Sequence, residues 1–400
     1  MVLVTALAAL AAAILLAPAV SDLLSLSGVA LRRPRGRVPS GAGTARLLVL
    51  VPAHDEELLI GACLRSLMQQ RYPSDRIKVV VIADNCTDRT AALSRAAGVA
   101  CLERHDQPHP GKPQAIAWAL EHLPVRSFDA VVIVDADTRV DPDFARELSA
   151  AGPLRGKALQ PSNGVLNHAE NALTRMAGVL SAADHELAYA LKTRAGLNVP
   201  LSAGMCIGAD LLADGGWHAY SVCEDWELYA LLTERGAPIE GVPRARLYAE
   251  EAPTLAASGT QRRRWTAGKL VVLARRAWPL LRSRHIGAAQ KLDALAELSR
   301  PGPVLHLCLA AAVAAGTLIL HAPAALLLVA LLLLTLLRPA VYTTAALWRD
   351  PDPVRTIGAF AFLPVYAVWR AWTALTTMVT LGDKAWVRTA RERRSALPQP

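Results

Sequence analysis

Two patterns of hydrophobic and polar residues divide the chain, and the first consists of long uncharged apolar runs. Residues 2–20 and 303–337 carry no charged side chain. Because roughly 20 apolar residues cross the hydrocarbon core of a bilayer, the first run predicts one membrane-spanning helix. The second run, broken near His321 and Pro323, predicts two. Residues 356–382 are also apolar but contain Arg370, so we expect a re-entrant or interfacial segment rather than a fourth span.

The second pattern begins at residue 46 and alternates strand-like with helix-like segments. Short runs rich in β-branched residues occur at 47–52, 77–83 and 130–136, separated by helix-like stretches such as 56–70 and 111–123. Continuous apolar strands alternating with helices predict an α/β fold with a mostly parallel sheet covered on both faces. Such sheets bind ligands at the carboxyl ends of their strands, where each of these runs becomes acidic or polar.

Composition and charge both indicate a membrane-associated protein. Hydrophobic residues make up 53% of the 400 residues and the mean hydropathy is +0.27, which excludes a disordered chain, a collagen and a freely soluble enzyme. The net charge is +9, yet residues 46–261 contain 20 Lys and Arg against 27 Asp and Glu. Basic residues therefore flank the apolar segments, where they favour the cytoplasmic face and anionic headgroups over nucleic acid. The six cysteines form no CxxC pair, which favours free thiols in a reducing compartment.

Basic residues also predict the orientation of the chain in the cell membrane. Four arginines between residues 32 and 37 follow the first apolar run, so we expect the N-terminus outside and the following domain in the cytoplasm. Five basic residues between 384 and 394 predict a cytoplasmic tail, which favours three spans over four. The expected segments are a membrane helix at 1–30, a basic linker at 31–45, a cytoplasmic α/β domain at 46–261, basic amphipathic interfacial helices at 262–300, two membrane helices at 301–346, a re-entrant, interfacial or additional membrane segment at 347–383 and a basic tail at 384–400.

Asp135-Ala136-Asp137 ends the third strand-like run. Two carboxylates at positions i and i+2 can hold Mg²⁺ or Mn²⁺, and these cations usually also take phosphate oxygens of a substrate. Acidic residues at a strand end also close turns without binding anything. The motif therefore indicates a metal site only in combination with the residues around it.

Polar residues after the other strands allow the same two interpretations. Asp84 can accept a hydrogen bond from a nucleobase or ribose, or it can cap the next helix. Pro52, His54 and Glu56 either form one wall of a nucleotide site or begin a helix. Lys112, after Gly111, opens a helix, and a cation at a helix N-terminus suits phosphate as well as it suits solvent.

Two further motifs lie later in the chain. Glu224-Asp225 opens a helix, where acidic residues either complement the helix dipole or supply a general base for an attacking hydroxyl. Gln261, Arg264 and Trp265 lie where the α/β segment meets the amphipathic one. Arg and Trp anchor helices at lipid headgroups, and a guanidinium beside an indole can also neutralise a leaving diphosphate next to an acceptor.

The order and spacing of these motifs resemble those of the membrane-embedded family 2 glycosyltransferases, which include ceramide glucosyltransferase and the synthases of cellulose, chitin, hyaluronan and poly-N-acetylglucosamine. A strand-end aspartate is followed by the DxD motif, then by Glu-Asp and then by Gln-x-x-Arg-Trp. The resemblance covers roughly residues 46–270 and the layout of the flanking spans. It implies a GT-A fold and an inverting transfer from a nucleotide-sugar, which we expect to be a UDP-sugar.

The resemblance also implies a role for each motif. The base of the donor would be bound by Asp84 together with Pro52, His54 and Glu56, and Lys112 is a further candidate for binding the donor. Asp137, with Asp135, would hold a Mg²⁺ or Mn²⁺ ion and the diphosphate. Asp225, with Glu224 as the alternative, would take the proton of the acceptor. The diphosphate and acceptor would be braced by Gln261, Arg264 and Trp265.

Three positions depart from the family pattern. Cys223 precedes Glu224 where the family usually has Thr, and Pro113 follows Lys112 where a small residue is usual. Residues 202–208 lie where the synthases usually carry a Gly followed by basic residues at the acceptor site. The acceptor is therefore open between a lipid-linked molecule and a growing polysaccharide.

From these observations we expect a multi-pass membrane glycosyltransferase that acts on a membrane-associated acceptor. Three spans are few for a self-contained translocation channel, which favours a lipid-linked or short-chain acceptor over a processive exopolysaccharide synthase subunit with export or polymerisation partners. A catalytically silent membrane scaffold is the alternative of another class. The joint presence of the four motif aspartates and Arg264 argues against it.

Overall fold

The computed structural model describes residues 2–31, 44–213, 216–321 and 324–379, which form two compact units. Within the described residues, 44–167 and 198–250 make up the sheet unit, and 2–31, 168–197 and 251–379 make up the helical unit. The predicted α/β domain at 46–261 thus differs from the sheet unit, because residues 168–197 pack with the helices. Most of the predicted basic linker and the basic tail lie outside the described residues.

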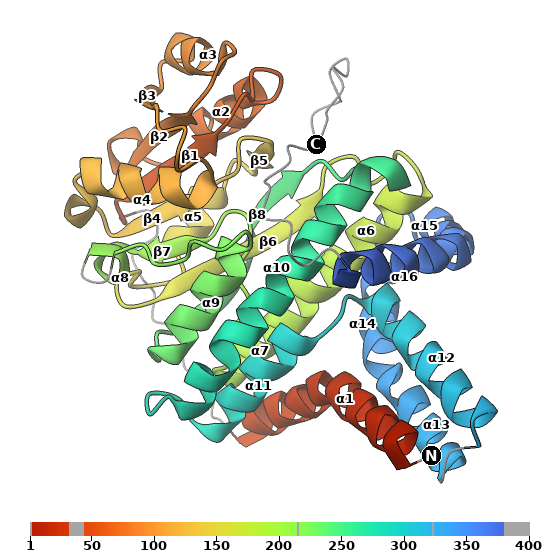
Figure 1. Ribbon diagram of the computed structural model, residues 1–400. Coiled ribbons are helices and arrows are strands. Elements are labelled where there is room, and N and C mark those ends of the chain that lie inside the picture. The colour runs from red at the N-terminus through yellow and green to blue at the C-terminus, as the bar shows by residue number, and fades with distance from the viewer. Residues whose placement is uncertain (1, 32–43, 214–215, 322–323, 380–400) are drawn as a thin grey trace. The chain divides into compact units, whose positions relative to one another are not determined.

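The sheet unit is built on an eight-stranded mixed sheet in the order β3-β2-β1-β4-β7-β6-β8-β5 (Figure 1). The first four strands in this order are parallel, β7 runs antiparallel to both of its neighbours, β6 and β8 are parallel, and β5 is antiparallel to β8. The predicted α/β class and GT-A-type sheet are confirmed. The strands are β1 Leu47–Ala53, β2 Ile77–Asp84, β3 Ala100–Arg104, β4 Ala130–Ile133, β5 Thr138–Val140, β6 Ala158–Val165, β7 Cys206–Gly208 and β8 Ile239–Ala249.

Strand β1 is central, and all seven of its residues are buried, as its uninterrupted apolar sequence predicts. Pro52 is tolerated there because the pairing of β1 with β4 ends at Leu50, so the missing N–H of the proline costs no hydrogen bond to β4. Helix α2 packs on the sheet through Ile60, Leu64 and Leu67, which lie on one helix face. The helices of this unit are α2 Ile60–Met68, η1 Ser74–Arg76, α3 Thr90–Ala96, α4 Lys112–His122, η2 Val125–Ser127, α5 Phe144–Ser149, α8 Ala209–Ala213 and α9 Glu224–Glu234.

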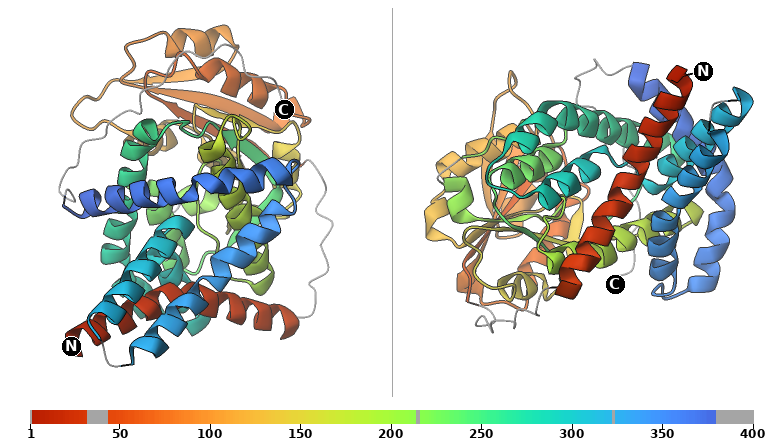
Figure 2. Two further views of the ribbon diagram at one scale, coloured as in Figure 1. Left: turned by 90° about the vertical axis from the view of Figure 1, so that its right-hand side faces the viewer. Right: turned by 90° about the horizontal axis from the view of Figure 1, so that it is seen from below.

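The helical unit contains the apolar runs and the amphipathic segment (Figure 2). The first helix, α1, packs against α7, α11, α12 and α13. The helices of the helical unit are α1 Val2–Leu31, α6 Ala172–Ala182, the π-helix η3 Ala183–Ala188, α7 Tyr189–Ala195, α10 Leu255–Arg282, α11 Ala288–Ser299, α12 Pro303–Ile319, α13 Ala325–Thr335, α14 Leu337–Leu347, α15 Pro353–Ala359, η4 Phe360–Phe362 and α16 Leu363–Val379.

Buried charged residues connect α1, α7 and α11. Lys192 of α7 forms an ion pair with Asp293 and, at 2.9 Å, with Glu297, both on α11. Ser21 of α1 donates a hydrogen bond to the same Asp293 carboxylate. Because an uncompensated buried charge is costly, this cluster fixes the positions of α1, α7 and α11 relative to one another. Nothing in the sequence indicated it, since the partners lie about 100 and 270 residues apart.

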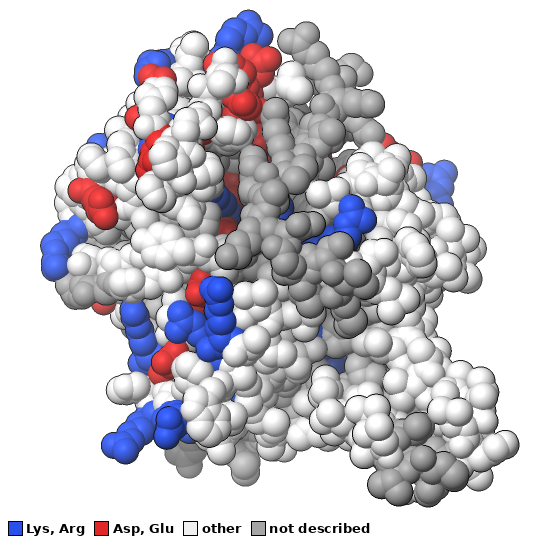
Figure 3. Space-filling model, in the orientation of Figure 1, with Lys and Arg blue, Asp and Glu red and all other residues white. Residues whose placement is uncertain are grey.

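Two of the described helices are long and apolar enough to cross a bilayer, at Thr5–Ala30 and Ala325–Leu347. The pair α11 and α12 qualifies as a third candidate only if it counts as one span, and it is bent by 84°. Leu318 of α12 and Leu326 and Leu333 of α13 are exposed. The described surface at the lower right of the space-filling view, where these helices lie in Figure 1, shows no Lys, Arg, Asp or Glu (Figure 3). The number of spans therefore stays a prediction.

Candidate active site

In the parallel half of the sheet, the carboxyl ends of β1, β2 and β4 lie next to one another, along the edge formed by the strand ends. The loop after β1 is held to the end of β2 by a hydrogen bond of 2.7 Å between His54 Nδ1 and the carbonyl oxygen of Asp84. The Asp55 carboxylate also accepts a hydrogen bond of 2.7 Å from the backbone N–H of Thr87. This clustering of polar residues follows from parallel pairing, since neighbouring parallel strands end on the same side.

Asp135 and Asp137 lie in the turn that follows β4. Both are partly exposed, whereas Ala136 between them is only 4% exposed and packs into the core of the sheet unit. They lie in a turn that is closed by a hydrogen bond of 3.0 Å from the backbone N–H of Thr138 to the carbonyl oxygen of Asp135. Oxygen ligands from one or two carboxylates are what Mg²⁺ and Mn²⁺ take from proteins that bind them together with phosphate. The pair is therefore compatible with the predicted cation.

Lys112, the first residue of α4, joins two of the predicted motifs. Its Nζ lies 2.6 Å from Asp135 Oδ1 and 2.8 Å from Glu224 Oε1. Burial opposes the charged ammonium, yet the two carboxylates hold the pKa of Lys112 above its ordinary value. A permanent positive charge thus lies between the DxD motif and the first turn of α9.

Asp225 and Glu224 begin α9 but have different environments. Glu224 is 8% exposed and paired with Lys112, whereas the Asp225 carboxylate accepts a hydrogen bond of 2.8 Å from the backbone N–H of Trp226. Burial and the neighbouring charge of Glu224 raise the pKa of Asp225 to about 7, while Lys112 opposes this shift. A carboxylate with a pKa near neutrality is well matched to taking a proton at physiological pH.

Asp84 lies at the end of β2 and is 4% exposed. Its carboxylate accepts hydrogen bonds from Arg104 Nη1 at 2.6 Å and from the backbone N–H of Gly111 at 3.0 Å. Asp84 thereby supports the turn that presents Lys112, and it does not cap α3, whose first N–H is bound by Asp88. Its predicted contact with the donor base stays a prediction.

Arg104 is the residue of this site that the sequence did not reveal. Its side chain is 5% exposed and bridges Asp84 and Asp106, with 2.6 Å to each. The only signal is the register of β2 and β3, which places Asp84 opposite Arg104. Register is a property of the folded sheet, so the pairing could not be read from spacing alone.

Three residues beside this edge, Asp55, Cys86 and Asp88, have ligand atoms within 4.8 Å of one another. Burial raises the pKa of the Cys86 thiol to about 11, so it is protonated and a poor metal ligand at neutral pH. The Asp55 carboxylate accepts from the backbone N–H groups of Thr87 and Asp88. We interpret this cluster as a turn-closing arrangement rather than a metal centre.

Gln261, Arg264 and Trp265 lie on α10 in the helical unit. They are spaced by three and four residues and so share one helix face. Trp265 is 42% exposed, and the guanidinium of Arg262 lies 5.2 Å from the centre of its ring. The predicted contacts of these residues with diphosphate and acceptor stay predictions.

We expect Lys112→Met to move the acid limb of the pH–rate profile to higher pH. Because Lys112 lowers the pKa of Asp225, removing its charge leaves Asp225 protonated over a wider range, and activity should fall more at pH 6 than at pH 8. Initial rates between pH 5 and pH 9 check this. Lys157→Met is the control, because Lys157 forms a comparable ion pair of 3.0 Å with Glu240, and its profile should keep its shape. An unshifted acid limb in Lys112→Met would contradict the assignment.

A mixed α/β sheet with aspartates at its strand ends and a DxD pair beside a helix-opening Glu-Asp defines the GT-A class of nucleotide-sugar-binding fold. The chain matches the family model described as "Glycosyltransferase like family 2" over residues 45–268. It belongs to this family.

Curated relatives match more than half of the chain. The beta-monoglucosyldiacylglycerol synthase of Synechocystis sp. is 28% identical over 231 residues, which is 56% of this chain and 47% of the relative. The probable glycosyltransferase YdaM of Bacillus subtilis is 25% identical over 250 residues, covering 57% of this chain and 56% of the relative. The chain thus spans about half the length of the curated relatives it matches.

A solved structure resembles the chain over most of its length. The mannosyltransferase PcManGT from Pyrobaculum calidifontis, in complex with GDP-Man and Mn²⁺, has a TM-score of 0.58 and 22% sequence identity. The alignment covers 92% of this chain and 99% of that chain. This likeness confirms the predicted fold.

Proposed function

We propose that this protein is an inverting membrane glycosyltransferase that transfers a sugar from a nucleotide-sugar, for which a UDP-sugar is our expectation, to a lipid-linked acceptor. The observation that carries the proposal is the Lys112 bridge, because it holds the DxD motif beside the helix that begins with Glu224 and Asp225. A donor bound at Asp135 and Asp137 would then present its sugar next to a carboxylate with a pKa of about 7.

In this proposal Asp225 takes the proton of the acceptor hydroxyl while the oxygen attacks the sugar carbon opposite the diphosphate. Glu224 is less suited, because its carboxylate is engaged by Lys112. Asp84 and the residues after β1 would bind the base, and Lys112 would place positive charge near the diphosphate.

The donor would bind together with Mg²⁺ or Mn²⁺ held by Asp137 and Asp135. Both residues are partly exposed, which leaves room for the phosphate oxygens and waters that complete the coordination of such ions. When bound, the cation supplies positive charge that stabilises the leaving diphosphate.

A lipid-linked acceptor is favoured over a growing polysaccharide. The helical unit offers two described helices able to span a membrane, or three if the bent pair counts as one, which is few for a channel that would translocate a polymer. The Synechocystis relative is named for a glucosyldiacylglycerol product, whereas another relative, from Arabidopsis thaliana, is named as a glucomannan mannosyltransferase. The size of the product separates these alternatives.

The test is to incubate membranes containing the protein with a panel of radiolabelled nucleotide-sugars and to size the labelled product. We expect one donor to label an organic-extractable lipid. A long water-soluble polymer would indicate a processive synthase, and no turnover of any donor would indicate a silent scaffold.

We expect a reporter fused after Arg394, outside the described residues, to read as cytoplasmic. Five basic residues follow the last apolar segment, and basic residues are retained on the cytoplasmic side. A reporter inserted after His321, between α12 and α13, should read as external and serves as the control. An external reading of the C-terminal reporter would show that 356–382 spans the membrane.

A further inference from the structure

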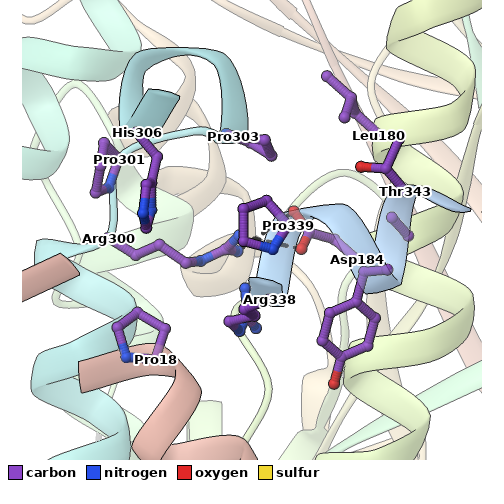
Figure 4. A pocket seen from close by; sticks show the side chains of 12 residues that line it. Pro18, Leu180, Asp184, Arg300, Pro301, Pro303, His306, Arg338, Pro339 and Thr343 are labelled. Atoms are coloured by element: carbon purple, nitrogen blue, oxygen red, sulfur yellow. Dashed lines mark hydrogen bonds and ion pairs between the residues drawn. The ribbon is translucent and has the colours of Figure 1, made fainter. Parts of the chain in front are cut away.

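A small cavity in the helical unit is lined by charged residues that the proposed reaction does not use. It measures about 20 Å³ and lies among α1, α6, η3, the start of α12 and α14 (Figure 4). A site of this size admits one or two oxygen-sized atoms and excludes a sugar ring or a nucleobase. Arg300, Arg338 and Asp184 contribute its charged side chains.

Arg338 is the residue that points to a ligand. Its side chain is 9% exposed, its Nε lies 2.7 Å from Asp22 Oδ2, and its guanidinium lies 5.0 Å from the centre of the Tyr342 ring. Its Nη2 is buried and has no hydrogen-bond partner among the described residues. Since buried donors of charged groups are almost always satisfied, an acceptor from outside the chain is expected at this atom.

The charge of the lining favours an anionic acceptor. Arg300 pairs through both terminal nitrogens with Asp184, at 3.1 and 3.3 Å, and its Nε lies 3.2 Å from Glu297. The lining therefore contains two guanidinium groups and the carboxylate of Asp184, and Asp22 and Glu297 pair with the same two guanidinium groups from outside the lining. His306, which also lines the cavity, shares a hydrogen bond of 2.8 Å with Thr335 through its Nε2.

We propose that this cavity binds a phosphate group through Arg338, with Arg300 as the second cation. One or two phosphate oxygens fit the measured volume, and an oxyanion matches the geometry of a guanidinium. The phosphate comes either from an anionic lipid headgroup or from free phosphate. The inference that the phosphate belongs to a lipid rests on the proposed function, which places the protein in a membrane. The inference that the cavity binds a phosphate group does not depend on it.

The position of the cavity suits a headgroup. It lies where the apolar helix α12 begins at Pro303, and Arg338 follows the apolar helix α13. The hydrogen bond between His306 and Thr335 shows that these two helix ends are level with each other. Arg338 lies within the candidate span Ala325–Leu347, and a long basic side chain inside a span can extend toward phosphate headgroups.

The test uses the full-length protein in detergent and its midpoint of thermal unfolding. The probes are dioctanoyl phosphatidic acid, dioctanoylglycerol, which lacks only the phosphate, and inorganic phosphate. We expect phosphatidic acid to raise the midpoint by roughly 2–5 °C near saturation and dioctanoylglycerol to have no comparable effect. Arg338→Gln should abolish the rise. Arg355→Gln, which removes an exposed arginine, should retain it.

A second variant keeps the test decisive if Arg338→Gln fails to fold. Thr343→Ile fills the cavity without changing its charge and should also abolish the rise. An equal rise with inorganic phosphate, lost in either variant, supports a free-phosphate site, and a rise with phosphatidic acid alone supports a lipid site. An undiminished rise in both variants, or no rise with either phosphate probe, overturns the proposal. Sugar transfer is measured separately, so a failure of the proposed reaction is distinguishable.

Discussion

Asp225→Asn is expected to lower kcat by about 10²–10⁴-fold with donor affinity nearly unchanged. The hydroxyl of an acceptor is a poor nucleophile until its proton is taken, and general-base catalysis typically contributes this factor. Asparagine preserves the shape of the side chain and its position in the first turn of α9 but cannot accept the proton. Steady-state kinetics give kcat, and titration with the donor nucleotide-sugar gives the affinity.

Two companion variants show whether the loss is specific. Asp84→Ala should weaken donor binding, provided that thermal unfolding shows the fold is intact once Arg104 has lost this partner. Glu224→Gln should reduce kcat less than Asp225→Asn and move the acid limb of the pH–rate profile to lower pH. This direction follows because the charge of Glu224 raises the pKa of Asp225. Near-normal kcat in Asp225→Asn, with a large loss in Glu224→Gln, would make Glu224 the base.

Chelation of divalent cations is the second large expected effect. EDTA should abolish transfer, and Mn²⁺ or Mg²⁺ should restore it. Asp137→Ala should reduce kcat/KM by roughly 100-fold or more, because a bound cation contributes several kcal/mol to stabilising charge in the transition state. The melting temperature should be nearly unchanged, since Asp137 is a partly exposed loop residue.

Asp143→Ala is the matched control for this prediction. Asp143 lies six residues further along the chain and pairs with Arg71 and Arg146 at the surface, so its loss should leave both metal dependence and rate intact. Full activity in the presence of EDTA would exclude the cation and leave Lys112 as the group that neutralises the diphosphate.

The sequence by itself determined three of the eight strands and where the chemistry-bearing residues lie along the chain. The apolar runs at 47–52 and 77–83 became β1 and β2 with almost the predicted bounds, because hydrophobic periodicity is a local property that reports burial directly. The third run, 130–136, was predicted too long. Strand β4 ends at Ile133, where its pairing with β1 stops; its pairing with β7 stops one residue earlier, at Val132.

The tertiary structure alone decided which of these residues meet. Lys112 and Glu224 are 112 positions apart, and only the fold places their charged atoms at 2.8 Å. The sequence left Asp225 and Glu224 open as bases, and only the fold gives them different partners: Glu224 pairs with Lys112, whereas Asp225 accepts from the backbone N–H of Trp226. Which of them is the base stays a prediction. The sequence did not predict strand β7 or the buried ion pair between Lys192 and Asp293 for the same reason. In both cases the contacting residues are distant in sequence, and only the packing of the folded chain brings them together.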